Sequence, residues 1–258
     1  MSLAHHLNQL LPPALRPVEL ATARYLRWSR GIVQAGPFRG MRYIARAHGS
    51  ALAPKIAGTY EQEIQPYLAK LRAINPDVFV DIGAAEGYYA VGAAFARWFP
   101  RIIAYESDDT ARRDLAALMT LNQVDPARID VRGTCAAGAL NTLLADCLRP
   151  AVLMDAEGHE LLLLDPLRVP HLARCHLLVE HHDFLVPGLR DEICQRMGGT
   201  HDITLIEQAP RRAEDLACAD PFVRLFPSGI RRRVLGEQRP FTNHGWLWLT
   251  PRPVPATL

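Results

Sequence analysis

The sequence lacks most of the patterns that mark membrane, disulfide-bonded and nucleic-acid-binding proteins. No apolar run approaches the roughly 20 residues that span a bilayer, and no Lys- or Arg-headed apolar segment opens the chain. The five cysteines are widely spaced and form no Cys-x-x-Cys pair, so neither a disulfide framework nor a zinc knuckle is expected. A net charge of +2 is too small to indicate a nucleic-acid partner or a membrane surface. These absences predict a cytoplasmic globular protein.

The first 60 residues differ in charge from the rest of the chain. They hold eight of the 29 Lys and Arg residues and a single acidic residue, Glu19. Apolar residues at helical spacing around positions 20–28 predict a short amphipathic helix. A chain of 258 residues has room for one full α/β domain and a modest extension. We therefore predict an N-terminal helical extension or lid over residues 1–60 and one main domain over residues 61–258.

From residue 77 onward, short apolar segments alternate with segments of helical periodicity. This alternation predicts parallel βαβ units and a doubly wound α/β sheet. Two later segments, 202–206 and 245–250, are joined by a long Arg- and Pro-rich connection without a clear crossover helix, so we expect a terminal antiparallel pair. The other predicted strands cover residues 78–82, 102–106, 129–132, 151–155 and 177–180, and the predicted helices cover residues 88–99, 110–121, 137–148 and 160–173.

A glycine-containing loop follows the first predicted strand. It reads Asp81-x-Gly83-x-x-x-Gly87 and leads into a predicted helix. At the carboxyl end of a parallel strand, glycines let the backbone turn sharply and approach a ligand closely. A dinucleotide fingerprint needs a middle glycine where this chain has Ala85, and the acid that begins the motif suits an ammonium group better than a pyrophosphate. The amino-acid end of S-adenosylmethionine fits, since Asp81 could accept a hydrogen bond from its α-amino group.

Glu106 ends the second predicted strand, 19 positions after Gly87. One helix and one strand require this separation, and a carboxylate at that place can grip a ribose diol with two hydrogen bonds. The third strand leads to Thr134, where an adenine would lie. Together these features predict a nucleoside-type cofactor. Its predicted contacts are Asp81, Gly83, Ala84, Gly87, Tyr88, Glu106, Thr134 and Asp155.

A second acidic segment follows the fourth predicted strand and reads Asp155-Ala-Glu157-Gly158-His159-Glu160. Asp155 is expected at the carboxyl edge of the sheet, where open α/β sheets bind ligands. Glu160 is well placed to act only as a first-turn acid of the next helix. The following strand ends at Glu180-His181-His182.

With the loop at 81–87, these two segments resemble the FkbM-type group of class I methyltransferases. That group has a hydrophobic-Asp-x-Glu-Gly-x-Glu segment and a following strand that ends in Glu-x-His. The similarity covers residues 60 to 182 well and the remainder loosely. It implies a Rossmann-like, seven-stranded sheet, S-adenosylmethionine as the methyl donor, and transfer to a hydroxyl of a sugar or other small molecule. The Tyr88-Tyr89 pair, the doubled histidine and the N-terminal extension depart from the family pattern and concern the substrate more than the cofactor.

Methyl transfer to a hydroxyl requires a group that takes up the hydroxyl proton. His181 and His182 are the candidate general bases, with Asp155 as a third catalytic residue, because all three end strands at the same edge. Adjacent strand residues point to opposite faces, so at most one histidine is expected to face the pocket directly. Tyr60, Glu157 and Glu180 are the predicted substrate contacts.

The residues near this edge also include O and N donors that a divalent metal could use. Their spacing fits no specific coordination pattern, so a divalent metal is left open but not favoured, and no residue is assigned as a ligand. The donors are Asp155, Glu157, His159, Glu180, His181, His182 and Asp183. Asn243 and His244, just before the last strand, are candidates to line the acceptor pocket. The expected partner is a small-molecule acceptor, with no nucleic acid and no membrane, and a homodimer is left open.

Two other functions compete with methyl transfer. An NAD(P)-dependent oxidoreductase would need the missing middle glycine, and NAD binding without S-adenosylhomocysteine binding would select it. A catalytically silent module that keeps the fold for interactions would bind the cofactor without transferring methyl groups. Nothing in folding requires the carboxylate–histidine set, which disfavours the silent module.

Overall fold

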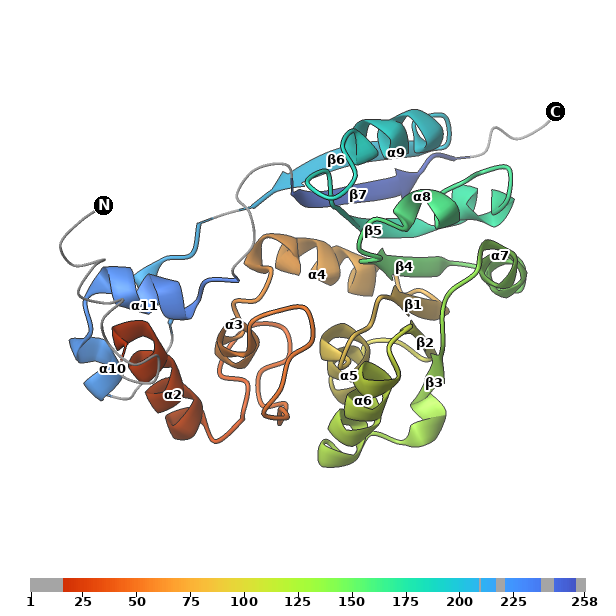
Figure 1. Cartoon of the computed structure of the whole chain (residues 1–258). Coiled ribbons are helices and arrows are strands. Elements are labelled where there is room, and N and C mark those ends of the chain that lie inside the picture. The colour runs from red at the N-terminus through yellow and green to blue at the C-terminus, as the bar shows by residue number, and fades with distance from the viewer. Residues whose placement is uncertain (1–15, 209, 217–220, 238–243, 254–258) are drawn as a thin grey trace. The chain divides into compact units, whose positions relative to one another are not determined.

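The computed structural model describes residues 16–208, 210–216, 221–237 and 244–253. The chain divides into two compact units, the first made of residues 1–62 and 209–239 and the second of residues 63–208 and 240–258 (Figure 1). Residues 209–239 therefore belong to the same unit as the N-terminal segment. The division into an extension and a main domain at residue 60 stays a prediction about how the chain is organised.

The first unit is helical. Its core contains the fully buried side chains of Tyr25, Phe38 and Met41, and the helices α10 and α11 pack against α2. The helix predicted around residues 20–28 is present as α2. It has a Pro in its first turn and ends at Arg30, whose backbone is in the left-handed conformation. The helices of this unit are α2 (Pro17–Ser29), α3 (Leu52–Ala57), η5 (Ala213–Asp215), α10 (Pro221–Leu225) and α11 (Ser228–Val234).

The second unit contains a seven-stranded sheet of order β3-β2-β1-β4-β5-β7-β6. The first five strands pair in parallel, and β7 pairs antiparallel with both β5 and β6. The predicted fold class and the antiparallel pair are confirmed, and each predicted strand lies within one residue of its observed bounds. The strands are β1 (Val78–Ile82), β2 (Ile102–Tyr105), β3 (Ile129–Arg132), β4 (Pro150–Met154), β5 (His176–His181), β6 (His201–Glu207) and β7 (Gly245–Pro251).

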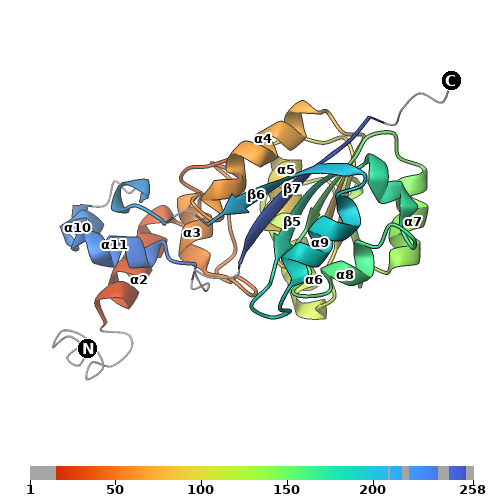
Figure 2. The same ribbon diagram turned by 90° about the horizontal axis from the view of Figure 1, so that it is seen from above.

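Helices cover both faces of this sheet (Figures 1 and 2). Right-handed crossovers place the helices that connect β1 to β2 and β2 to β3 on one face of the sheet. After β3 the chain crosses the sheet in the opposite direction, so the later connecting helices cover the other face. The first face carries α4 (Gln65–Ala73), α5 (Tyr88–Phe95) and α6 (Asp109–Leu121), and the second carries α7 (Ala137–Ala145), α8 (Glu160–Leu163) and α9 (Leu189–Met197).

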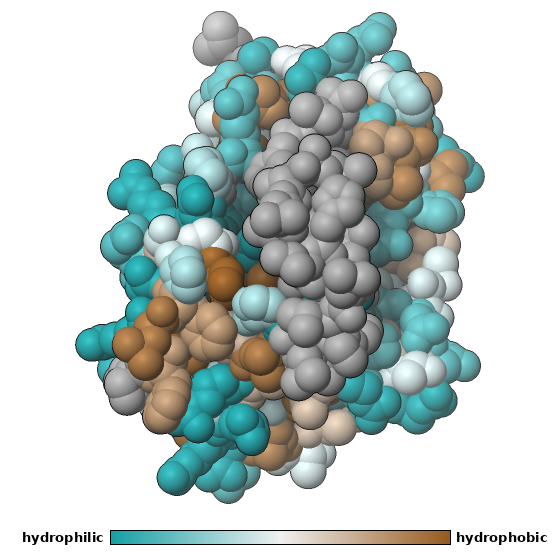
Figure 3. Space-filling model, turned by 60° about the vertical axis from the view of Figure 1, so that its left-hand side comes forward, coloured by the Kyte–Doolittle hydropathy of each residue, from teal (hydrophilic) through white to brown (hydrophobic). Residues whose placement is uncertain are grey.

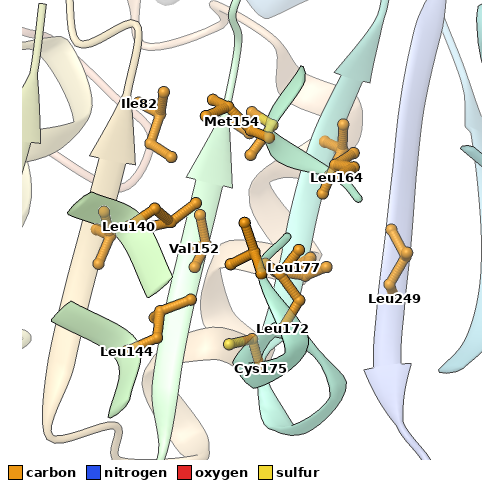
Figure 4. Packing of buried hydrophobic residues seen from close by; sticks show 14 of the residues in the cluster. Ile82, Leu140, Leu144, Val152, Met154, Leu164, Leu172, Cys175, Leu177 and Leu249 are labelled. Carbon is orange, nitrogen blue, oxygen red and sulfur yellow. The ribbon is translucent and has the colours of Figure 1, made fainter. Parts of the chain in front are cut away.

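Alternation along the strands decides which side chains meet which helices. Val152 and Met154 of β4, Leu177 of β5 and Leu249 of β7 pack with Leu140 of α7 in one apolar cluster (Figure 4). The residues between them in sequence therefore face α4, α5 and α6. The rings of Tyr67 in α4 and Trp248 in β7, whose centroids are 5.8 Å apart, are an example of packing on this first face.

The predicted helix over residues 160–173 is wrong in its extent. α8 ends at Leu163, and a 3₁₀ helix, η4 (Pro170–Arg174), follows after a turn. The Asp165 carboxylate accepts a hydrogen bond from the Leu167 backbone N–H at 2.9 Å, across Pro166, which disfavours helix at the residue before it. The helices α9, α10 and α11 were not predicted.

No helix in the described part of the chain is long and apolar enough to cross a membrane. On the side shown in Figure 3, hydrophobic residues form separate patches among larger hydrophilic areas. Exposed large apolar side chains such as Leu148 and Leu167 are ordinary on globular surfaces when they occur singly.

Candidate functional site

The order of the strands identifies the edge of the sheet where a ligand fits. β1 and β4 are neighbours, but the chain leaves β1 toward β2 and leaves β4 toward β5. The connections after these strands diverge, so the carboxyl ends of β1 and β4 flank a topological switch point, the usual place for ligands in open α/β sheets.

Gly83 permits a close approach between the loops that follow these two strands. Its φ is +82°, and a Cβ atom there would lie 1.7 Å from the backbone oxygen of Asp155. The Asp155 N–H donates to the Ile82 carbonyl at 2.9 Å, so the two chains stay paired past the strand ends. A side chain at position 83 is excluded by both backbone conformation and space.

At Gly87 it is neighbouring side chains, and not a backbone oxygen, that leave no space for a Cβ atom. The φ of Gly87 is +95°, and a Cβ there would lie 2.7 Å from the Val91 side chain and 2.9 Å from the Leu115 side chain. The residue caps the amino end of α5 and lets α5 pack against α6. Between the two glycines, Ala85 also has a positive φ of 48°, so the loop turns tightly enough to present backbone N–H groups.

The Glu106 carboxylate lies against this loop. One of its oxygens accepts the Ala85 N–H at 2.7 Å, and the other accepts the Asp108 N–H at 2.7 Å. Two backbone donors therefore fix the orientation of the carboxylate. The oxygen that accepts the Asp108 N–H also lies 3.5 Å from the Ser107 hydroxyl, a contact that a ligand hydroxyl could replace, and the oxygen that accepts the Ala85 N–H retains a further lone pair for a ligand.

The remaining predicted cofactor residues lie at the same edge with different exposures. Asp81 and Tyr88 are buried, and Tyr88 makes an edge-on contact with Tyr89, with ring centroids 5.1 Å apart. Ala84 is also buried. Thr134, two residues beyond β3, is exposed.

Four elements, β4, α8, β5 and β7, bring acidic and histidine side chains together beside this loop. Leu177 and Val179 belong to the apolar cluster of Figure 4, so Glu180 and His182 point to the opposite face of the sheet, where Asp155 also lies. In the register of β7, His181 pairs with Gly245, which places His244 beside His182. We call Asp155, Glu160, Glu180, His182 and His244 the histidine–carboxylate cluster.

His182 is the centre of the histidine–carboxylate cluster. Its Nδ1–H donates to Glu160 at 3.0 Å. Its Nε2 lies 3.4 Å from the Asp155 carboxylate and 3.6 Å from that of Glu180. Glu160, Glu180 and His182 are all buried. Burial by itself would raise the pKa of Glu160, but the hydrogen bond from His182, backbone N–H groups and the charge of His182 together outweigh it, so the pKa is lowered.

His244 completes the histidine–carboxylate cluster from the antiparallel strand. Its Nε2 lies 2.6 Å from Oε1 of Glu180, and its Nδ1 lies 2.9 Å from the amide nitrogen of Gln208. Each histidine is thus held at its outer nitrogen, by Glu160 or by Gln208, while its other nitrogen points toward Glu180.

His181 does not join the histidine–carboxylate cluster. It points to the other face of the sheet, and its Nδ1 lies 3.7 Å from Asp183. Burial lowers the pKa of His181 to about 4, so the ring is neutral at neutral pH. The expectation that only one of the two histidines faces the predicted site agrees with this geometry.

Other predicted site residues lie elsewhere. Glu157 is exposed, with a φ of +47°, and the neighbouring His159 is exposed too. Tyr60 is buried in the first unit, where the Lys55 ammonium lies 4.8 Å from the centroid of its ring. Asn243 lies outside the described residues.

Sequence reasoning missed two members of this arrangement. Gln208 was not considered, and Glu160 was interpreted as a helix-start acid, although one of its oxygens contacts both the Ala156 N–H and His182. The register of β7 against β5 and β6 is the signal that would have found Gln208 and linked His244 to Glu180.

No family model and no curated protein matches this chain. Among solved structures it is similar to an rRNA methylase from Streptococcus thermophilus, which is 10% identical with a TM-score of 0.47 over 73% of this chain and 96% of that one. A putative O-methyltransferase from Klebsiella pneumoniae is 14% identical with a TM-score of 0.46, and an O-methyltransferase from Bacillus cereus in complex with SAH is 10% identical with a TM-score of 0.45; each comparison covers 96% of both chains. Similarity at this level identifies neither a family nor an acceptor.

Proposed function

We propose that this chain is an S-adenosylmethionine-dependent methyltransferase. The observation that carries the proposal is the Glu106 carboxylate, which two backbone N–H groups hold against the loop after β1 at the topological switch point. A carboxylate fixed in this way fits the two hydroxyls of a ribose. The loop itself fits an amino-acid end better than a pyrophosphate, because Asp81 begins it and Ala85 replaces the middle glycine of a dinucleotide site.

In this proposal the residues of the loop edge bind the methyl donor. Asp81 accepts from the α-amino group, Glu106 holds the ribose, and Thr134 neighbours the adenine. The backbone around Gly83, Ala84 and Gly87 and the ring of Tyr88 complete the site, with Asp155 between the donor and the acceptor. FkbM-type membership and a sugar or other small-molecule hydroxyl as acceptor are the finer parts of the same proposal.

Calorimetric titration with S-adenosylhomocysteine tests the cofactor site. Glu106→Gln removes a charge-assisted hydrogen bond worth about 1.5–3 kcal/mol, so we expect affinity to fall about 10- to 100-fold. Asp81→Asn should weaken binding similarly. Glu207→Gln is the matched control, because Glu207 is an exposed glutamate that ends β6. Unchanged affinity in both Asp81→Asn and Glu106→Gln would remove the proposed site.

The same titrations distinguish the two competing functions. Binding of NAD without binding of S-adenosylhomocysteine would identify a nucleotide-dependent oxidoreductase. Tight binding of S-adenosylhomocysteine, with no transfer of a labelled methyl group to any acceptor in a metabolite extract, would identify a silent module.

The chemical step transfers a methyl cation equivalent from sulfur to oxygen. The acceptor oxygen forms a bond to the methyl carbon as the carbon–sulfur bond breaks, and the hydroxyl proton leaves to a base. We propose that a histidine after β5 takes this proton. His182 is better placed than His181, because it shares the face of Asp155 and Glu180. Glu180 and Glu157 are the proposed acceptor contacts within the second unit.

Single alanine variants test the histidine base. We expect His182→Ala to lower the turnover number by about 100-fold or more, since a positioned general base contributes about 10²–10⁴-fold. His181→Ala should change turnover less. Near-normal turnover in both variants would exclude a histidine base while leaving the cofactor site intact.

A further inference from the structure

The inner nitrogens of the two histidines of the histidine–carboxylate cluster converge on Glu180. The ligand atoms that Glu180, His182 and His244 offer all lie within 4.8 Å of one another, and all three residues are buried. The Asp155 carboxylate adds a fourth donor, 3.4 Å from His182 Nε2. Two atoms that each lie about 2.1 Å from one ion are about 3.0 Å apart at a right angle and about 3.4 Å apart at a tetrahedral angle. The distances of 3.4 Å and 3.6 Å from His182 Nε2 to the Asp155 and Glu180 carboxylates are close to the tetrahedral value. The 2.6 Å between His244 Nε2 and Glu180 Oε1 is a hydrogen-bond distance, which would lengthen when an ion replaces the proton.

Hydrogen bonds at the outer nitrogens orient both histidines. Glu160 accepts from Nδ1 of His182, which leaves the Nε2 lone pair directed between the Asp155 and Glu180 carboxylates. His244 contacts the Gln208 amide through Nδ1. In the observed orientation the Gln208 amide nitrogen donates to Nδ1, and Nε2 carries the proton toward Glu180. Binding of an ion at Nε2 requires the Gln208 amide to turn over, so that its carbonyl accepts from Nδ1. Such outer partners accompany nearly all metal-binding histidines and fix the tautomer that binds.

Charge favours a cation at the same point. Three carboxylates, those of Asp155, Glu160 and Glu180, lie together in the histidine–carboxylate cluster, and two of them are buried. Buried carboxylates are costly unless cations or hydrogen bonds compensate them. A divalent ion would offset two of the three charges and would replace the proton between Glu180 and His244.

We propose that Glu180, His182 and His244, with Asp155 as a fourth donor, bind one divalent transition-metal ion. Two imidazole nitrogens with carboxylate oxygens suit Zn²⁺, Co²⁺ or Mn²⁺ and disfavour Mg²⁺ and Ca²⁺, which prefer all-oxygen sites. The binding site stands on its own geometry. Its role rests on the proposed function: the ion would lower the pKa of a bound acceptor hydroxyl, so that the hydroxyl proton leaves to water before methyl transfer, and in the ion-bound protein His182 would serve as a ligand in place of the base.

Titration of the metal-free full chain with Co²⁺ and with Zn²⁺ tests the site. His5 and His6 can bind such ions by themselves, so the background carries His5→Gln and His6→Gln. We expect one equivalent of Co²⁺ to bind, with visible absorption bands of a low-coordinate site. Glu180→Gln and His244→Gln should each weaken binding on the order of 100-fold or more, because loss of an outer partner alone costs about 10- to 100-fold.

Two variants of the same residue types serve as controls, His201→Gln at the start of β6 and Glu207→Gln at its end. Both should retain the ion affinity of the background. Equal losses in the controls, or the absence of stoichiometric binding in a folded background protein, would overturn the proposal. Binding of S-adenosylhomocysteine is measured on the same samples: if it persists while ions do not bind, only the metal site fails, and if ions bind without it, the proposed methyltransferase function fails.

Discussion

The two ends of the sheet carry the same kinds of residue in different surroundings. At the amino end, the His201 ring contacts the Thr200 hydroxyl at 2.8 Å and the Cys175 carbonyl at 3.0 Å, and the Asp77 carboxylate accepts two backbone N–H groups. At the carboxyl end, His182 and His244 contact carboxylates instead.

The difference lies in what satisfies each polar group. At the amino end, backbone groups and a hydroxyl satisfy the neutral histidine and the carboxylate, so those residues join chain segments and need no ligand. At the carboxyl end, ionisable side chains satisfy one another, which leaves charge that a ligand can compensate. The types of residue alone do not distinguish a structural end from a functional end; their partners do.

The largest loss of stability should come from a side chain placed between the loops that follow β1 and β4 at the carboxyl end of the sheet. Gly83→Ala places a Cβ against the Asp155 backbone oxygen at a positive φ, and we expect a loss of at least about 3 kcal/mol in the free energy of unfolding. Gly188→Ala has the same φ of +82° with open space around the Cβ, so it should cost only about 1–2 kcal/mol. Urea denaturation of both variants measures this difference, and equal losses would show that backbone strain alone sets the cost.

A smaller effect, on the affinity for Co²⁺, should follow from removing the negative charge of Glu160, which contacts Nδ1 of His182. Glu160→Gln keeps the size of the side chain but loses the anion that orients the ring, so Co²⁺ affinity should fall about 10- to 100-fold. A Co²⁺ titration followed by visible absorption measures it. An unchanged affinity would mean that Glu160 serves only the Ala156 N–H, as structural acids at the amino end do.

At the amino end, Asp77→Asn should destabilise the fold without affecting ligands. Burial would raise the pKa of Asp77, but hydrogen bonds from the Leu148 and Arg149 N–H groups outweigh it, so the pKa is lowered below 3.8. The contribution of Asp77 to the free energy of unfolding is complete above pH 3.8, and it is lost as the pH falls through the lowered pKa of the folded state. We expect a cost of about 1 kcal/mol at pH 7, a shallower acid limb in urea denaturation, and unchanged S-adenosylhomocysteine affinity. A loss of cofactor affinity would break the contrast between the two ends.

The smallest effect concerns the pH dependence that His201 contributes. Burial lowers its pKa below 6.5, so its contribution to stability is complete above pH 6.5 and decreases as the pH falls toward the lowered value. Between pH 8 and pH 6 the wild type should lose at most about 0.8 kcal/mol through this residue. His201→Gln should abolish that difference in denaturation measured at both pH values. A pH dependence identical to that of the wild type would contradict the neutral, structural interpretation.

The features that the sequence predicted well depend on residues close together in the chain. The Asp81–Gly87 loop and Glu106 are joined by one helix and one strand, so their meeting follows from element lengths. Alternation along β5 separated His181 from His182. Each of these inferences needed only local periodicity.

The features that were missed depend on pairing between distant segments. His244 meets Glu180 because β7 runs antiparallel to β5 in one register, and a shift of one residue would turn His244 to the other face. The interruption of the helix after Leu163 required the Asp165-Pro166 turn to outweigh helical periodicity. The grouping of residues 209–239 with residues 1–62 likewise depends on contacts between segments that residues 63–208 separate in the sequence.

The contact between Gly83 and Asp155 has an evolutionary consequence. Main-chain atoms alone set the spacing between the loop proposed to hold the methyl donor and the strand end proposed to face the acceptor. In the proposed methyltransferase, substitutions at exposed positions such as Glu157 would therefore change the acceptor that is recognised without displacing the donor. Under that proposal, the protein would acquire a new acceptor by changing side chains while the reacting partners keep their separation.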